Sequence, residues 1–169
     1  MSEKIALLGD SLFEWGDWDE MLQTDKQIIN LGVSGETTRE IGNRVGLIDD
    51  DVSTVIIMGG INDLFLGYTV DTIFSNYKNM IDDLLKRNFK LVVLSTLYVT
   101  EMYARIQAKN ISKLNKLLEE YAKERSIIYD DLNSSMATGD ILDVENSTDG
   151  VHLSDIGYEK WAKRLQRYF

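Results

Sequence analysis

Short, unbroken apolar runs alternate with longer helical patterns along the chain, and this alternation constrains the fold more than any other feature. We predict strands over residues 4–8, 27–30, 55–58, 90–97 and 127–129. Several of these runs are continuously apolar, which is typical of strands whose two faces are both covered.

Helices with one apolar face are predicted between the strands. Their apolar residues recur at helical spacing, in three sets: Ile73, Tyr77, Ile81, Leu84 and Leu85; Ile111, Leu114, Leu118, Tyr121 and Ala122; and Tyr158, Ala162, Leu165 and Phe169. Ser154 is a plausible N-cap for the last helix. Strands that alternate with helices imply a parallel sheet with helices on both faces. Because we find no linker or repeat, we expect residues 1–169 to form a single three-layer α/β domain.

The residue inventory removes several kinds of chemistry. The chain has no cysteine, which excludes disulfides, thiolate metal sites and a cysteine nucleophile. It has one histidine, so zinc sites built from two or more histidines are excluded as well. Any chemistry that depends on a histidine must therefore use His152.

The charge of the chain bears on its partners and location. The net charge is −10, from 28 acidic and 18 basic residues. Such a surface repels nucleic-acid phosphates and anionic membranes, so we expect neither as a partner. The apolar run at residues 5–8 is too short for a signal-peptide core or a membrane span. We expect a cytoplasmic protein without stable membrane insertion, and self-association remains open.

Polar, glycine-rich segments follow the predicted strands. Residues 9–12 follow the first strand, residues 31–38 the second and residues 59–63 the third, while residues 149–154 precede the final helix. Ligands of open parallel sheets bind beyond the carboxyl ends of the strands. We therefore expect these four segments to converge at one edge of the sheet and to form the site.

A serine and a histidine in these segments are candidates for nucleophilic catalysis. Ser11 lies at the expected start of a helix, but a serine alcohol is a weak nucleophile until a base takes its proton. His152 could be that base, with Asp149 three residues earlier and Gly150 allowing a tight turn between them. The alternatives are that Ser11 only caps its helix, and that His152 is a surface histidine beside a turn aspartate.

Acyl transfer also needs N–H groups aimed at the oxygen of the tetrahedral intermediate. The backbone N–H groups of Ser11 and Gly35 and the side-chain amide of Asn62 are the candidates. The alternatives are a turn glycine at Gly35 and a loop asparagine at Asn62 that bonds its own backbone.

Other polar and aromatic residues near these segments have simpler interpretations. Asp10 and Asp63 are expected to brace loops by accepting backbone N–H bonds rather than to act as acids. Trp15 and Trp18 could border the site as apolar walls or pack in the core, and the sequence does not separate the two.

The four segments, taken in order, resemble the conserved blocks of the SGNH (GDSL) hydrolase superfamily. The sequence GDSL at residues 9–12 resembles the first block and Gly35 the second. GIND at residues 60–63 resembles the third block, and Asp149 with His152 resembles the last. Within the superfamily, residues 31–38 and 152–158 are most similar to the platelet-activating-factor acetylhydrolase-like branch.

This resemblance implies a flavodoxin-like fold of about five parallel strands and hydrolysis of esters or thioesters without a metal or other cofactor. It makes Ser11 the nucleophile, His152 the general base and Asp149 its orienting partner. Ser11, Gly35 and Asn62 would form the oxyanion hole. Many relatives have proline after the catalytic histidine, where this chain has Leu153, and also after the fourth strand, where it reads TLYV at residues 96–99.

We therefore expect a serine esterase that acts on a small acyl ester, with a short acyl group such as acetyl. One alternative keeps the same site and makes the substrate an O-acetylated saccharide. Another is a flavodoxin-like binding module without catalysis, which is less favoured because the chain has neither a GxGxxG sequence nor a P-loop.

Overall fold

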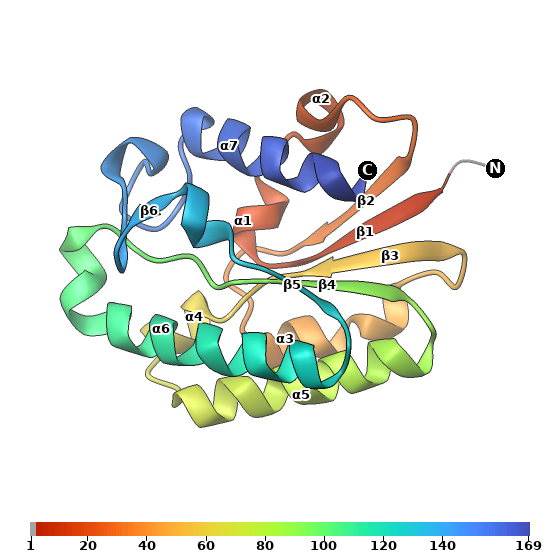
Figure 1. Ribbon diagram of the computed structural model, residues 1–169, viewed down its shortest axis with the longest axis horizontal. Coiled ribbons are helices and arrows are strands. Elements are labelled where there is room, and N and C mark those ends of the chain that lie inside the picture. The colour runs from red at the N-terminus through yellow and green to blue at the C-terminus, as the bar shows by residue number, and fades with distance from the viewer. Residues whose placement is uncertain (1–2) are drawn as a thin grey trace.

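The computed structural model describes residues 3–169 and is built on a sheet of five parallel strands (Figure 1). The strands follow the order β2-β1-β3-β4-β5, which is the flavodoxin-like doubly wound order. Their bounds are β1 (Lys4–Gly9), β2 (Gln27–Gly32), β3 (Val52–Ile57), β4 (Lys90–Leu94) and β5 (Ile128–Asp130). The predicted fold class is confirmed.

Helices cover both faces of this sheet (Figure 1). One face carries α3 (Thr38–Asn43), α5 (Val70–Lys86) and α6 (Glu101–Glu124), and the other carries α1 (Ser11–Glu14), α2 (Trp18–Leu22) and α7 (Asp155–Leu165). The short helix α4 (Ile61–Phe65) follows β3, and a small antiparallel pair, β6 (Ala137–Thr138) and β7 (Ile141–Leu142), lies between β5 and α7.

Alternate residues of the central strands enter two separate hydrophobic cores. In β1, Ala6 and Leu8 pack on the α5 side, whereas Ile5 and Leu7 pack on the α7 side. All four side chains are completely buried. Full burial of a Leu or Ile side chain contributes roughly 1.5–3 kcal/mol. Both faces of β1 are therefore apolar, which explains its unbroken apolar sequence.

Two strand boundaries differ from the prediction by three residues, and the others agree to within two. The strand predicted over 90–97 ends at Leu94, because the backbone N–H and C=O of Thr96 bond to the side-chain amide of Asn115 instead of a strand, at 2.8 Å each. A side-chain amide thus replaces the backbone ladder where the chain leaves the sheet. The third strand begins at Val52, three residues before its predicted start.

The helices follow their predicted stripes, and the last helix is capped as expected. Tyr77 and Ile81 of α5 and Leu114 and Leu118 of α6 are completely buried. The side chain of Ser154 accepts the N–H of Gly157 at the start of α7, which confirms it as the N-cap.

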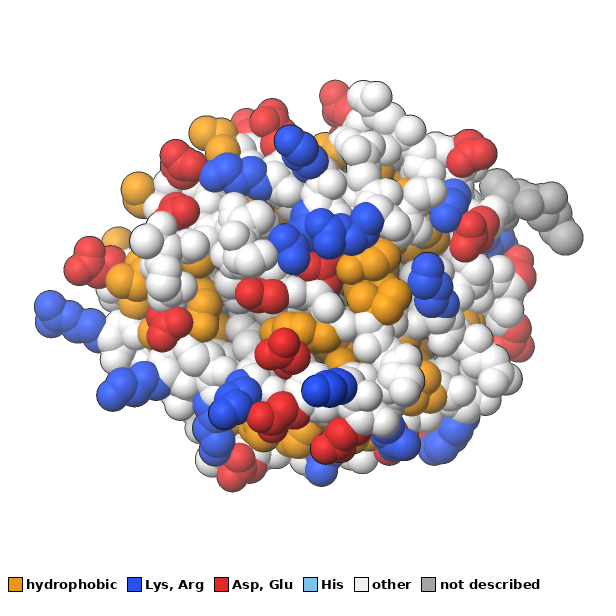
Figure 2. Space-filling model, in the orientation of Figure 1, with side chains coloured by type: hydrophobic (Ala, Val, Ile, Leu, Met, Phe, Trp, Pro, Cys, Tyr) orange, Lys and Arg blue, Asp and Glu red, His pale blue; other side chains and the backbone are white. Residues whose placement is uncertain are grey.

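The surface carries charges of both signs. Acidic and basic side chains alternate over the face shown in Figure 2. Across residues 3–169, each helix is too short or too polar to cross a bilayer.

Candidate active site

Ser11 lies at the first position of α1, immediately beyond the carboxyl end of β1. The N-cap of this helix is Asp10, whose Oδ1 accepts the N–H of Leu12 at 3.0 Å. The interpretation of Ser11 as a mere helix cap is therefore wrong, because the neighbouring aspartate has that role. The Ser11 side chain is left available for a contact with the last loop of the chain.

His152 lies in that loop, and Asp149 fixes its position. One carboxylate oxygen, Oδ1, accepts the backbone N–H groups of Val151 and His152 at 2.9 and 2.8 Å. The other, Oδ2, lies 2.7 Å from Nδ1 of the imidazole. Each oxygen of the carboxylate thus has a separate function, one ordering the loop and one orienting the ring.

Gly150 makes the turn between these two residues possible. Its φ of +98° lies in the left-handed region that favours glycine, and its carbonyl accepts the N–H of Thr100 at 3.0 Å. A Cβ at this position would lie only 2.8 Å from Thr100 Oγ1. The turn is therefore packed directly against the segment that follows β4.

The fold joins the serine and the histidine although 141 positions separate them. Ser11 Oγ lies 3.0 Å from His152 Nε2. Because the Asp149 carboxylate can only accept a hydrogen bond when ionised, Nδ1 carries the proton and Nε2 is free to take one from Ser11. The histidine is therefore not an isolated surface residue.

Asp149 is ionised at neutral pH. Partial burial raises the pKa of this carboxyl, but the hydrogen bonds from the side chain and backbone of His152 outweigh that effect. The net result is a pKa below the ordinary aspartate value. The ring of His152 thus has a permanent negative charge beside its Nδ1–H.

The two tryptophans near the site have different roles. Trp18 is buried in the core and donates its Nε1–H to Phe13 O at 2.7 Å. Trp15 is 54% exposed, and its ring stacks on the imidazole of His152 with centroids 4.1 Å apart and planes at 24°. Only Trp15 borders the site, which settles a question that the sequence left open.

The predicted oxyanion donors follow β1, β2 and β3: Ser11 begins α1, Gly35 lies in the loop after β2, and Asn62 lies in α4. Gly35 has a φ of +80°, and Asn62 donates one amide N–H to Glu36 O at 2.9 Å, which ties α4 to the Gly35 loop. An amide has two N–H bonds, so one remains for a ligand. Within the described chain, the backbone N–H groups of Ser11 and Gly35 have no acceptor. All three predicted donors thus have an N–H to offer.

Asp63 and Arg44 hold the loop after β2 in place. Asp63 accepts the N–H and the hydroxyl of Thr38 at 2.8 and 2.7 Å, which together with the cap at Asp10 confirms the predicted bracing aspartates. Arg44 pairs with Glu36 and also donates to two backbone carbonyls, at 2.7 Å to residue 31 and 3.1 Å to residue 9. No pattern in the sequence singles out Arg44, because these partners lie far from it in the chain.

A buried carboxyl lies directly beside the serine. Asp10 is completely buried, and burial raises its pKa to about 6, although the N–H of Leu12 and the nearby His152 favour the charged form. Its Oδ2 has no hydrogen-bond partner within residues 3–169. Burial likewise raises the pKa of Asp63. Both bracing residues are therefore costly to ionise.

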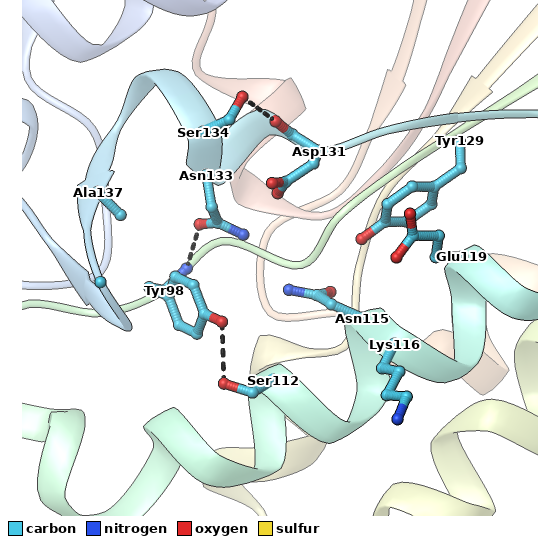
Figure 3. Close-up of a pocket in the computed structure, with 11 residues that line it drawn as sticks. Tyr98, Ser112, Asn115, Lys116, Glu119, Tyr129, Asp131, Asn133, Ser134 and Ala137 are labelled. Atoms are coloured by element: carbon cyan, nitrogen blue, oxygen red, sulfur yellow. Dashed lines mark hydrogen bonds between the residues drawn. The ribbon is translucent and has the colours of Figure 1, made fainter.

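A separate polar cavity of about 340 Å³ lies between α6 and the segment after β5, and its lining includes none of the candidate site residues (Figure 3). The Tyr98 hydroxyl lies 2.9 Å from Ser112 Oγ, and Asn133 Oδ1 accepts the backbone N–H of Tyr98 at 2.8 Å. These polar groups bond to one another and support the chain where it leaves β4.

Several solved structures share the fold. A protein of Streptococcus pneumonia, provisionally described as a platelet activating factor, superposes with a TM-score of 0.90 at 24% identity, over 99% of this chain and 84% of that one. A lipase/acylhydrolase from Enterococcus faecalis superposes with a TM-score of 0.81 at 24% identity, over 98% of this chain and 96% of that one. The acetyl xylan esterase AlAXEase gives 0.81 at 21% identity, over 98% of each chain. At these identities the similarity establishes the fold.

A curated relative shares part of the sequence. The N-acylneuraminate cytidylyltransferase of Streptococcus agalactiae serotype V is 27% identical over 112 residues, which are 66% of this chain and 27% of that protein. The chain thus spans about a quarter of the length of the curated relatives it matches.

The family model of the GDSL-like Lipase/Acylhydrolase family matches residues 7–160, a range that includes both Ser11 and His152. The match covers most of the chain, and the superposed structures have the same five-stranded parallel sheet. This chain therefore belongs to the GDSL-like lipase/acylhydrolase (SGNH) family of ester hydrolases.

Proposed function

We propose that this protein is a serine esterase that cleaves short-chain acyl esters, acetyl esters foremost, with residues 1–169 acting as one catalytic domain. The observation that carries the proposal is the chain of contacts from Ser11 Oγ to His152 Nε2 at 3.0 Å and from His152 Nδ1 to Asp149 Oδ2 at 2.7 Å. A hydroxyl so placed loses its proton to the imidazole as it attacks a carbonyl carbon.

The reaction follows from the roles of these groups. Ser11 Oγ bonds to the carbonyl carbon while its proton moves to His152 Nε2, and the Asp149 carboxylate stabilises the imidazolium. The intermediate then collapses, the bond to the alcohol breaks, and Nε2 returns the proton to the leaving oxygen. Water attacks the acyl-enzyme in the same way, with its proton passing through Nε2, and releases the acid and the free serine.

The N–H groups of Ser11, Gly35 and Asn62 would stabilise the negative oxygen of each tetrahedral intermediate. This role is supported by the free N–H groups of the first two and by the anchoring of Asn62 through Glu36. Removal of one such donor costs about 10²–10³-fold in kcat. We therefore expect Asn62→Ala to lower kcat by that factor.

The preference for short acyl groups is supported by the size of the elements at the site. The helices that carry Ser11 and Asn62 have only 4 and 5 residues. Neither is long enough to fold over the serine and enclose an extended acyl chain. We therefore expect a shallow site, which fits acetyl better than a long fatty acid.

Three measurements test the proposal. A fluorophosphonate should label the protein at Ser11, and Ser11→Ala or His152→Ala should lower kcat for p-nitrophenyl acetate by on the order of 10⁴–10⁶-fold. Ser134→Ala, at an exposed serine of the η2 turn at Leu132–Ser135, serves as the control and should keep full activity. A series of p-nitrophenyl esters should show activity falling as the acyl chain lengthens. Full activity of Ser11→Ala, or ligand binding without turnover or labelling, would refute the assignment.

A second candidate substrate is an O-acetylated saccharide, cleaved by the same site. It is favoured by the sequence shared with a protein named for an acylated sugar acid and by the structural similarity to an acetyl xylan esterase. Acetate release from O-acetylated N-acylneuraminate and acetyl-xylan, compared with an acetyl-phospholipid at equal concentration, separates the two candidates. Faster release from the saccharides would identify the sugar as the leaving group.

A further inference from the structure

The exposed indole of Trp15 is held on two sides, which is unusual for a surface aromatic side chain. One face stacks on His152 at 4.1 Å, and its Nε1–H donates to Ser34 Oγ at 3.0 Å. Aromatic pairs are typically worth about 0.5–1.5 kcal/mol beyond the burial of their surface. The indole therefore has a defined orientation although more than half of its surface is exposed.

Glu14 supports this orientation from the neighbouring position. Its carboxylate accepts the backbone N–H of Ser34 at 2.9 Å and also accepts the Ser34 hydroxyl. Because the Ser34 proton points to Glu14, the Ser34 oxygen presents a lone pair to the indole N–H. Glu14, Ser34 and Trp15 thus form a directed chain of hydrogen bonds that ends at the indole, which in turn stacks on the histidine ring.

A close approach of backbone segments makes this chain possible. At Gly32, the last residue of β2, a Cβ would lie 2.2 Å from the backbone nitrogen of Glu14. Only glycine lets α1 approach the end of β2 so closely. The same contact brings Ser34, which precedes the oxyanion donor Gly35, within reach of both Glu14 and Trp15.

The contacts of His152 with Ser11 and Asp149 leave the tilt of the imidazole ring free, and the indole restricts that tilt. Ser11 and Asp149 contact the two ring nitrogens, which lie on the ring edge. Contacts on the edge fix the ring position but restrain its tilt weakly. The indole lies against the face of the ring and excludes water from it.

We propose that Trp15 is a positioning residue for the His152 base, which holds the plane of the imidazole so that Nε2 stays directed at Ser11. This proposal rests on the proposed esterase function. The aromatic face also attracts the imidazolium that forms when His152 takes the serine proton. The contact therefore supports the ring before proton transfer and stabilises its charge afterwards.

Three variants and a control test the proposal with p-nitrophenyl acetate. Trp15→Leu should lower kcat by about 10–10²-fold, since a displacement of catalytic groups by 1 Å costs up to about 10²-fold, while KM changes little. Trp15→Phe should recover most of kcat, because a phenyl ring keeps the stack without the bond to Ser34. Ser34→Ala should cost a few-fold, about as much as the Phe variant. Leu47→Ala, at an exposed leucine in the η1 turn at Val45–Leu47, should leave kcat unchanged.

A spectroscopic measurement checks the stack without relying on activity. His152 is the only histidine, so its ring protons give one set of NMR signals. The indole should shift these signals upfield in the wild type and in Ser11→Ala, and the shift should disappear in Trp15→Leu. This measurement also shows whether the Leu variant is folded.

The possible results separate the two proposals. Wild-type activity that depends on Ser11, together with normal kcat in Trp15→Leu, would overturn the positioning role and leave the esterase assignment intact. Equal losses in the Leu and Phe variants, or a rise in KM alone, would also overturn it, because the indole would then act as bulk or as a substrate contact. Absence of any Ser11-dependent hydrolysis would refute the esterase proposal instead.

Discussion

Replacement of Asp149 by asparagine should damage catalysis more than its replacement by alanine. The reason lies in the two functions of the carboxylate. Oδ1 accepts the N–H groups of Val151 and His152, and Oδ2 faces Nδ1–H of the ring. An asparagine has only one accepting oxygen and must therefore fail at one of these two places.

The backbone contacts decide which place fails. If the asparagine oxygen keeps the two backbone N–H groups, its NH₂ faces Nδ1, which must then lose its proton. The proton moves to Nε2, and His152 can no longer accept one from Ser11. Turning the amide over restores the tautomer but points the NH₂ at the backbone N–H groups of Val151 and His152. The NH₂ occupies the place from which water could bond them, so each N–H loses its acceptor at a cost of about 2 kcal/mol. The total of about 4 kcal/mol corresponds to roughly 10³-fold in kcat.

Alanine at the same position imposes no wrong tautomer. The Asp149 side chain is 53% exposed, so water can take over part of its hydrogen bonding. The loss is then that of one charge-assisted hydrogen bond, about 1.5–3 kcal/mol or roughly 10–10²-fold. Steady-state kinetics of p-nitrophenyl acetate hydrolysis at neutral pH measures both variants. An asparagine variant as active as the alanine variant, or within tenfold of the wild type, would refute the reasoning.

Three further outcomes follow from other contacts. Burial raises the pKa of Asp10 to about 6 in the folded protein, above its unfolded value near 4. The contribution of Asp10 to stability is therefore full below pH 4 and is lost as the pH rises through 6. In urea unfolding, Asp10→Asn should gain up to about 3 kcal/mol of stability over the wild type between pH 4 and pH 8, and a pH-independent difference would contradict this. Gly150→Ala should lose about 3 kcal/mol or more of stability, since the new Cβ would contact Thr100 and also strain the backbone. Gly139→Ala, where φ is +60° and the surrounding space is open, should lose only about 1–2 kcal/mol. Equal losses in thermal unfolding would show that the clash with Thr100 is relieved. Arg44→Gln should lower kcat by about 10-fold and stability by roughly 1–3 kcal/mol, because two backbone carbonyls lose their donor. Unchanged kinetics would show that the loop after β2 keeps its position without Arg44.

The parts of this structure that could be predicted depend on local pattern and residue type. The five strands were predicted because residues such as Ile5 and Leu7 alternate with equally apolar neighbours that face the other core. Ser11 was assigned to the site because it lies in a polar segment that follows a strand, and such segments meet at one edge of a parallel sheet. His152 was assigned because it is the only histidine and lies in the polar segment before the last helix. Each of these assignments uses only residue type and position in the chain.

The parts that could not be predicted depend on contacts between distant segments. The end of β4 at Leu94 is set by the amide of Asn115, which lies 19 residues after the Thr96 backbone that it binds. The bonds from Arg44 reach carbonyls 13 and 35 residues away. The role of Trp15 depends on Ser34 in the next loop. No local pattern encodes these pairs, because each is decided by how closely two backbone segments approach.

The four residues of α1 link the two halves of the site. The helix begins with Ser11, the proposed nucleophile, and ends with Glu14, whose carboxylate accepts the N–H of Ser34 in the Gly35 loop. Trp15 follows the helix and stacks on His152, the proposed base. A rigid helix of one turn fixes these three side chains relative to one another. A movement of α1 against the sheet would therefore disturb the base, the nucleophile and the Gly35 loop together. The close contact at Gly32 prevents that movement, so a glycine that touches no substrate helps to hold the whole site in register.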